Sequence, residues 1–328
     1  MLPLTGARSL WRKIKYTLLA LSVAAAPAFA KLADEAGFSG EISINTGFTS
    51  STSNFNTDAD STISSNQQKA SSESSFLVAP LGSVAYTFGE KLNHQVYTGT
   101  ARDDVATGTV VLELGYKYQL ESGMTIDASL LPTIMSGETW ANPYEVGTAR
   151  SKTDETGNAF RLKLSSIAGS AFSLDMAYAT KDVEDDLVRE ELQRDAETFY
   201  LKGQYRQPIS RTMMLVPSLI YQSSSADGKA ASYEQFGGEV SLFGGMGRHQ
   251  YALTAGYNQR SYDASNPIYS KKRSDDNINL FAAYEYDQFM DWENWSFVSL
   301  AGYGTSDSNI TFYDESQYIV SVGLNYKF

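Results

Sequence analysis

Residues 317–328, at the end of the chain, alternate between apolar and polar side chains up to the final residue. Because successive side chains of a β-strand point to opposite faces, this alternation predicts a strand with one apolar face. That face would carry Tyr318, Val320, Val322, Leu324, Tyr326 and Phe328. Ile319 is the one large apolar residue on the opposite, polar face. An apolar face with aromatic rings at both ends is what a lipid-facing strand between two aromatic girdles requires.

Segments with the same alternation recur from residue 38 onward, separated by turns and polar loops. The clearest is 110–120, VVLELGYKYQL. About fourteen such segments can be counted, and single-chain bacterial barrels have an even number of strands. Short turns alternate with longer polar loops, of which 50–75 and 136–156 are the longest. The sequence therefore predicts an all-β protein, a transmembrane antiparallel up-and-down β-barrel with short periplasmic turns and long extracellular loops.

Three prolines fall inside the predicted strands, Pro80, Pro132 and Pro217. Each removes one hydrogen bond from a sheet that has no edge strand to place it on. Either these prolines mark bulges, or the count is too high by one hairpin and the barrel has twelve strands.

The N-terminal segment has the three parts of a secretory signal. Four basic residues lie between 8 and 15, an apolar stretch covers 18–26, and Ala28-Phe29-Ala30 is a cleavage site. The apolar stretch is shorter than the roughly 20 residues of a membrane-spanning helix, which disfavours the alternative of a retained anchor. We expect residues 1–30 to be a cleaved signal peptide and residues 31–328 to be a single outer-membrane barrel.

The charge balance excludes one class of partner. The whole chain has a formal net charge of −12, and loss of the four basic residues of the leader makes the mature chain more acidic. Nucleic-acid binding needs a basic surface, so we expect none. The chain has no cysteine, which excludes a lipid anchor on a thiol, a disulfide and a thiolate metal site.

If the apolar residues face lipid, the alternate residues face the barrel interior. The candidate lumen-lining residues are Glu41, Glu113, Lys117, Asp127, Arg161, Lys163, Asp175, Lys202, Arg206, Glu239, Arg260, Glu285 and Lys327. About fourteen strands leave room for water, and charges of both signs at a constriction would select solutes by size and charge. The alternative is that these residues pair across the interior and fill it. Likewise Arg161, Lys163, Lys202 and Arg206 either form a basic ladder or are neutralised by Asp175.

No pattern in the sequence indicates catalysis. His94 and His249 are the only histidines, and each directly follows a short turn. Both are expected at the periplasmic end as girdle or turn residues rather than as bases. No metal-ligand cluster or phosphate loop stands out, so no cofactor and no metal is expected. The acidic runs 103–104, 154–155, 182–191 and 275–276 map to outer loops, either as solvated charge or as sites for divalent cations shared with lipopolysaccharide.

The closing strand resembles that of bacterial outer-membrane β-barrels, in which the terminal Phe and the aromatic residues before it are recognised by the assembly machinery. GFSGEISINTGF at 37–48, TGTARDDVATGT at 98–109 with VVLELGYKYQL after it, and the closing strand are similar to a proteobacterial outer-membrane family, domain of unknown function 2860. The resemblance covers essentially the mature chain. It implies the fold, a location in the outer membrane of a Gram-negative bacterium and contact with lipid and lipopolysaccharide, but no site residues.

Two functions remain open at this point. The first is a passive or mildly selective diffusion pore for small hydrophilic solutes. The second is a narrow or plugged barrel whose extracellular loops bind a ligand, a surface or a phage. Neither is enzymatic.

Overall fold

The first and last strands of the chain pair with each other and close the sheet. β1 (Gly37–Thr52) and β16 (Glu315–Lys327) are antiparallel, with Glu41 opposite Lys327 and Thr52 opposite Ser316. The backbone of Phe328 continues the ladder, because its N–H donates to Gly40 O at 3.0 Å and its carbonyl accepts from Gly40 N–H at 2.9 Å. A Cβ at Gly40 would lie 2.7 Å from the tip of the Phe328 ring, so the absence of a side chain there makes room for the terminal ring.

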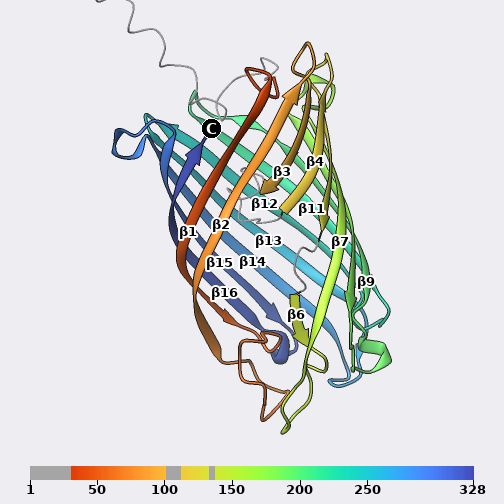
Figure 1. Cartoon of the computed structure of the whole chain (residues 1–328). Helices are drawn as coiled ribbons and strands as arrows, with labels where there is room; N and C mark the ends of the chain where they lie inside the picture. The colour runs from red at the N-terminus through yellow and green to blue at the C-terminus, as the bar shows by residue number, and fades with distance from the viewer. Residues whose placement is uncertain (1–30, 101–111, 133–136) are drawn as a thin grey trace, which may run out of the picture.

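The computed structural model describes residues 31–100, 112–132 and 137–328, and these form a closed antiparallel barrel of 14 strands (Figure 1). The strands between β1 and β16 are β2 (Ser72–Phe88), β3 (His94–Thr100), β4 (Leu112–Gln119), β5 (Thr125–Pro132), β7 (Lys152–Ser165), β8 (Phe172–Val183), β9 (Ala196–Tyr205), β11 (Met213–Ala226), β12 (Tyr233–Met246), β13 (His249–Asn266), β14 (Lys271–Asp287) and β15 (Trp295–Ser308). The short strands β6 (Gly137–Trp140) and β10 (Gln207–Pro208) only extend the ladders to β7 and β11. The predicted fold is confirmed.

The strand prolines are accommodated within fourteen strands. Pro132 is the last described residue of β5 and is opposite Asn158 of β7, and Pro80 is opposite Ile44 in the β1–β2 ladder. Pro217 falls between the β9–β11 and β10–β11 pairings, which end at Ser218 and Leu215. The ladders of the described residues contain a register shift between Ser261 and Ser265 of β13. Because the barrel has fourteen strands, the alternative of twelve is wrong.

The outer surface of the barrel is apolar and its inner face is polar, the reverse of a water-soluble protein. On the outside, Phe38, Leu219 and Phe236 are 74%, 77% and 60% exposed. On the inside, Ser43 and Asn45 are buried although both are polar. This inversion is the pattern of a barrel whose outer belt contacts lipid. No helix among the described residues has the length and apolar character needed to cross a membrane.

The two ends of the barrel differ. Short links, some with the 3-10 turns Ile167–Gly169 and Phe289–Asp291, lie at the same end as the start of β1 and the C-terminus (Figure 1). The opposite end carries the longer segments 53–71 and 184–195, the latter with the 3-10 turn Glu190–Leu192 in the acidic stretch. The polar stretch 261–275 would be read as a loop from its sequence but is mostly strand, because β13 reaches Asn266 and β14 begins at Lys271. The sequence there is polar on both faces, which hides the strand signal.

Candidate functional site

The barrel interior holds the candidate site, and one group of charges there comes from five consecutive strands. Arg161 on β7 donates from Nη1 to Glu113 Oε1 at 2.5 Å and from Nε to Asp175 Oδ1 at 2.9 Å. Glu113 is 1% exposed. The Tyr97 hydroxyl lies 2.9 Å from Glu113 Oε2 and 2.7 Å from Asp127 Oδ1. This connected network, which we call the charged wall, places carboxylates beside the guanidinium that offsets their burial.

The other sequence-predicted lysines and acids of the interior are also brought into contact. Lys117 Nζ lies 3.8 Å from Asp127 and 4.5 Å from the centre of the Tyr97 ring. Lys163 is in register between Asp127 and Asp175. Arg161 is paired with acids on both sides, and Lys202 is paired with Glu239 at 2.6 Å. These ion pairs neutralise the expected basic ladder. Of the two alternatives, the structure therefore favours neutralisation.

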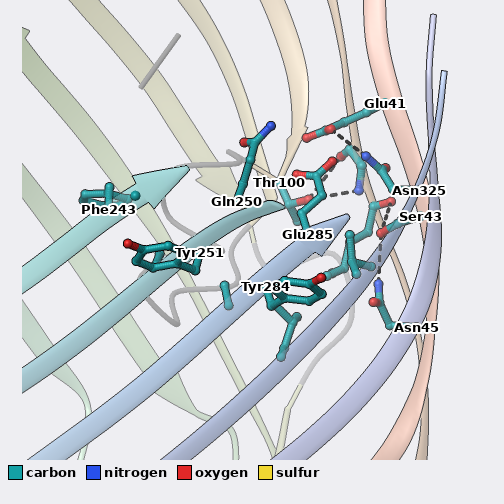
Figure 2. Close-up of a pocket in the computed structure, with 17 residues that line it drawn as sticks. Glu41, Ser43, Asn45, Thr100, Phe243, Gln250, Tyr251, Tyr284, Glu285 and Asn325 are labelled. Atoms are coloured by element: carbon teal, nitrogen blue, oxygen red, sulfur yellow. Dashed lines mark hydrogen bonds between the residues drawn. The ribbon is translucent and has the colours of Figure 1, made fainter. Parts of the chain in front are cut away.

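A second group of charges lies near the short-turn end, on β1, β14 and β16. Lys327 Nζ contacts Glu285 Oε1 at 2.7 Å and Asp287 Oδ1 at 2.9 Å. Asn325 donates to Glu41 at 2.9 Å, and Figure 2 shows the two side chains meeting in the interior. Arg206 lies at the same end and donates to the Ser166 hydroxyl at 2.7 Å. Of this group, Glu41, Glu285 and Asn325 line a cavity of about 140 Å³.

Part of the inner face is apolar, which the alternation pattern missed. Phe243, Ala252 and Leu300 line the 140 Å³ cavity together with Glu41 and Asn325, and Figure 2 shows Phe243 on the other side of the view from Glu41. The pattern assigned apolar residues to lipid, so inward apolar positions were not identified. The one visible signal was Ile319, out of phase in the closing strand.

The outer half of the interior contains two further cavities, of about 260 and 490 Å³. Arg260 and Glu315 line both of them. Arg260 lies over the Tyr233 ring with its guanidinium carbon 4.4 Å from the ring centre, and its Nε donates to Gln235 at 3.1 Å. Arg273 is stacked in the same way 3.7 Å from the Tyr313 ring and is paired with Asp275 at 2.8 Å. Arg260 is among the predicted residues, whereas Glu315 and Arg273 are not.

Aromatic residues of four outer links meet over this part of the barrel. This loop cluster consists of Phe55, Tyr144, Tyr269, Phe312 and Tyr313. The hydroxyls of Tyr144 and Tyr313 lie 2.8 Å apart, and the rings of Phe55 and Tyr313 stack with centres 5.7 Å apart. Burial raises the pKa of Tyr144 well above its ordinary value, and it raises the pKa of Tyr269 and Tyr313 in the same direction. The cluster joins links that are far apart in the sequence.

Arg150 joins two of these links through backbone carbonyls. Its Nη1 donates to Asn54 O at 2.7 Å, its Nη2 to Asp60 O at 2.7 Å and its Nε to Ser61 O at 3.1 Å. The guanidinium also lies 4.3 Å from the centre of the Trp140 ring. Burial lowers the pKa of Arg150. One side chain therefore fastens the link 53–71 to the link 141–151.

Neither histidine faces the interior. His94 Nδ1 lies 2.6 Å from the Tyr116 hydroxyl and His249 Nδ1 lies 2.8 Å from the Tyr284 hydroxyl, with Tyr118 and Tyr286 packed beside them. Both pairs belong to the exposed aromatic surface at the short-turn end. This position is that of a girdle residue.

The acidic runs are partly ion-paired in the described part of the chain. Glu155 contacts Lys181 at 3.7 Å and Asp186 contacts Arg194 at 2.6 Å. Asp275 lies in β14 and is fully buried, so its placement in an outer loop was wrong. No group of three or more acidic or histidine side chains among the described residues is arranged to hold a metal ion. The run 103–104 lies outside the described residues.

Comparison with known proteins gives a family and a set of similar structures. Residues 37–327 match the family described as "Protein of unknown function (DUF2860)". No curated protein matches the chain. A mutant of the TodX monoaromatic hydrocarbon channel is 11% identical, with a TM-score of 0.49 and 92% of each chain covered. The DcaP outer membrane channel of Acinetobacter baumannii is 11% identical, with a TM-score of 0.41 over 90% of this chain and 97% of its own. At these identities and TM-scores neither likeness indicates a substrate.

Proposed function

This chain belongs to the family described as protein of unknown function (DUF2860), and we propose that it is an outer-membrane channel that lets small hydrophilic solutes diffuse with mild selectivity. The proposal rests on one observation, the three cavities inside the closed barrel, which have volumes of about 140, 260 and 490 Å³. All three have charged or polar residues in their walls. A wide barrel with a polar interior is the architecture of a diffusion channel.

The proposed location is the outer membrane of a Gram-negative bacterium, after removal of residues 1–30. The apolar belt of the barrel supports it, because exposed Phe, Leu and Val side chains would be costly in water. Assembly there would involve the outer-membrane assembly machinery and lipopolysaccharide as partners. Fractionation of cells that express the full chain, followed by mass determination of the mature protein, tests the location and the cleavage together.

The expected selectivity is weak because many of the interior charges are paired. Arg161, Lys202 and Lys327 each contact carboxylates within 2.9 Å, so these charges create no large field of one sign along the described part of the lumen. Solutes would be sorted mainly by size and by the cavities they fit. We assign no chemical step to the protein.

Planar-bilayer recording tests the channel directly. Purified, detergent-folded protein is expected to give discrete conductance steps, and a salt gradient is expected to give a small reversal potential. A preparation unfolded by boiling is the control and should give no steps. If folded protein inserts into the bilayer and no conductance appears, the proposal is wrong.

The loop cluster favours a second candidate, in which the outer loops bind a ligand, a surface or a phage and the barrel serves as a support. Phe312 is fully buried and Tyr313 is 3% exposed in the cluster, so the outer links form a defined surface. Replacement of residues 53–71 by a short Gly-Ser linker distinguishes the two candidates. A receptor would lose binding, whereas a channel would keep its conductance or gain some.

A further inference from the structure

The 260 Å³ cavity, which we call the amide chamber, is lined almost entirely by amides and hydroxyls. Asn258 and Asn277 face each other across β13 and β14, and Asn279 and Gln317 flank Gly304 of β15. A Cβ at Gly304 would lie 3.2 Å from Asn279 Oδ1 and 3.4 Å from Gln317 Cγ, so the glycine leaves space between the two amides. The chamber is many times larger than the roughly 30 Å³ share of one liquid water.

Two opposite charges lie at this chamber without a counter-ion. In the described part of the chain, no carboxylate lies within ion-pair distance of the Arg260 guanidinium, and no cation lies within ion-pair distance of Glu315. Glu315 accepts one hydrogen bond, from the Ser53 hydroxyl at 2.5 Å. This contrasts with Arg161, Arg194 and Arg273, each of which is held by a carboxylate at 2.5–2.8 Å.

Arg260 is held in a fixed orientation although no carboxylate among the described residues pairs with it. Its guanidinium lies flat over Tyr233, its Nε donates to Gln235 and it also forms a hydrogen bond with the Tyr262 side chain, so only its remaining N–H groups are left for a ligand. A planar guanidinium fixed in this way suits the two oxygens of a carboxylate. Glu315, across the same cavities, suits an ammonium group.

We propose that the amide chamber is a binding subsite for a small zwitterion, a free amino acid or a short peptide, with its carboxylate on Arg260 and its ammonium on Glu315. The amides of Asn258, Asn277 and Gln317 match the peptide bond between the two charges, since each supplies both a donor and an acceptor. A simple anion would leave Glu315 unpaired beside it, and a neutral sugar would leave both charges unpaired. The subsite rests on the proposed channel function, which supplies the route by which the solute reaches it.

The test uses L-alanyl-L-alanine and two capped forms, N-acetyl-alanyl-alanine and alanyl-alanine amide. Binding is measured by isothermal titration calorimetry on the full mature chain in detergent. Wild type is expected to bind the free dipeptide at least tenfold more tightly than either capped form, the loss that follows from removing one charged hydrogen-bond partner. Equal binding of all three compounds, or no binding of any, would overturn the proposal.

Two variants, each of which replaces one charged side chain by a neutral amide, test which residue binds which end of the ligand. Arg260→Gln should bind the free dipeptide and its amide equally, and Glu315→Gln should bind the free dipeptide and its N-acetyl form equally. Arg206→Gln, at the far end of the barrel, is the matched control and should keep the wild-type preference. Retained heat-modifiable migration on gels confirms that each variant is folded. If both variants keep the full wild-type preference, the assignment is wrong.

Conductance separates this proposal from the function on which it rests. A protein that conducts ions but does not distinguish the capped dipeptides is a channel without the subsite. A protein that distinguishes them but never conducts has the subsite, and then the proposed channel function fails.

Discussion

The ring of Tyr97 lies across Gly115, its register partner on β4. A Cβ at Gly115 would be 2.5 Å from the Tyr97 hydroxyl oxygen and 2.6 Å from Cε1. The glycine is therefore the reason that the phenol can reach Glu113 and Asp127 along the charged wall. A phenol has one proton, so it can donate to only one of the two carboxylates at a time.

Gly115→Ala is expected to push Tyr97 off the charged wall. Overpacking of this kind costs about 1–3 kcal/mol, and the buried Glu113 loses a hydrogen-bond partner as well. Urea unfolding in detergent, followed by gel migration, measures the loss. Gly256→Ala, also on an inward strand position, has its nearest neighbour at 3.7 Å and should be close to neutral. Equal stability of the two variants would contradict this account.

Arg161→Met is expected to be the most damaging of the simple charge removals. It leaves Glu113 and Asp175 without the guanidinium that contacts both, and an uncompensated buried charge typically costs about 3–5 kcal/mol. The same unfolding assay measures it. The control is Lys91→Met, in a short turn. Its partner Glu121 is fully solvated, so the unfolding midpoint of this variant should not move. If Arg161→Met lowers the free energy of unfolding only slightly, the remaining side chains of the charged wall must rearrange to compensate Glu113 and Asp175.

The closing strand shows how much of the fold could be predicted from the sequence. Its alternation from Tyr318 to Phe328 sets which face meets lipid, since a slip of one residue would reverse every side chain. The same rule applied to the other strands gave the strand number. It failed at 261–275, where Tyr262 and Arg273 point inward beyond the apolar belt and no apolar face remains to reveal the strand.

The partners within the lumen could not be predicted in the same way. Arg161 meets Glu113 across β5, and Arg273 of β14 meets the Tyr313 ring of the link between β15 and β16. Such contacts depend on the register of every intervening ladder and on barrel closure. Alternation alone also cannot show that Arg260 donates to Gln235 rather than to an acid, or that Arg150 binds carbonyl groups rather than an acid.

The loop cluster should resist alkali up to a pH above the ordinary tyrosine pKa of about 10. Burial raises the pKa of Tyr144, Tyr269 and Tyr313, so the neutral cluster contributes stability that is complete below pH 10 and is lost as the pH rises through the higher folded-state values. Absorbance at 295 nm should show a late step in addition to the main titration.

Two phenylalanine variants assign that late step. Tyr144→Phe and Tyr313→Phe should each reduce it, because each removes one buried phenol of the cluster. Titration of every tyrosine in one step near pH 10 would show that the cluster opens readily.

Arg150→Leu is expected to release the link 53–71 from the link 141–151 while the barrel stays intact. The change removes charged hydrogen bonds to Asn54, Asp60 and Ser61 carbonyls, each worth about 1.5–3 kcal/mol. Trypsin should then cut after the exposed Lys69 at least about tenfold faster, the ratio that about 1.4 kcal/mol produces.

The control for this prediction is Arg189→Leu, which replaces an exposed arginine in the link 184–195 and should leave the rate of cutting unchanged. If Arg150→Leu is cut no faster than the control, the aromatic rings and the backbone hydrogen bonds from Arg150 to Ser61 and from Gly147 to Ile63 hold the two links together without this side chain. An unchanged unfolding midpoint alongside faster cutting would show that the outer links open independently of the strands, because the ladders from β1 to β16 do not depend on this side chain.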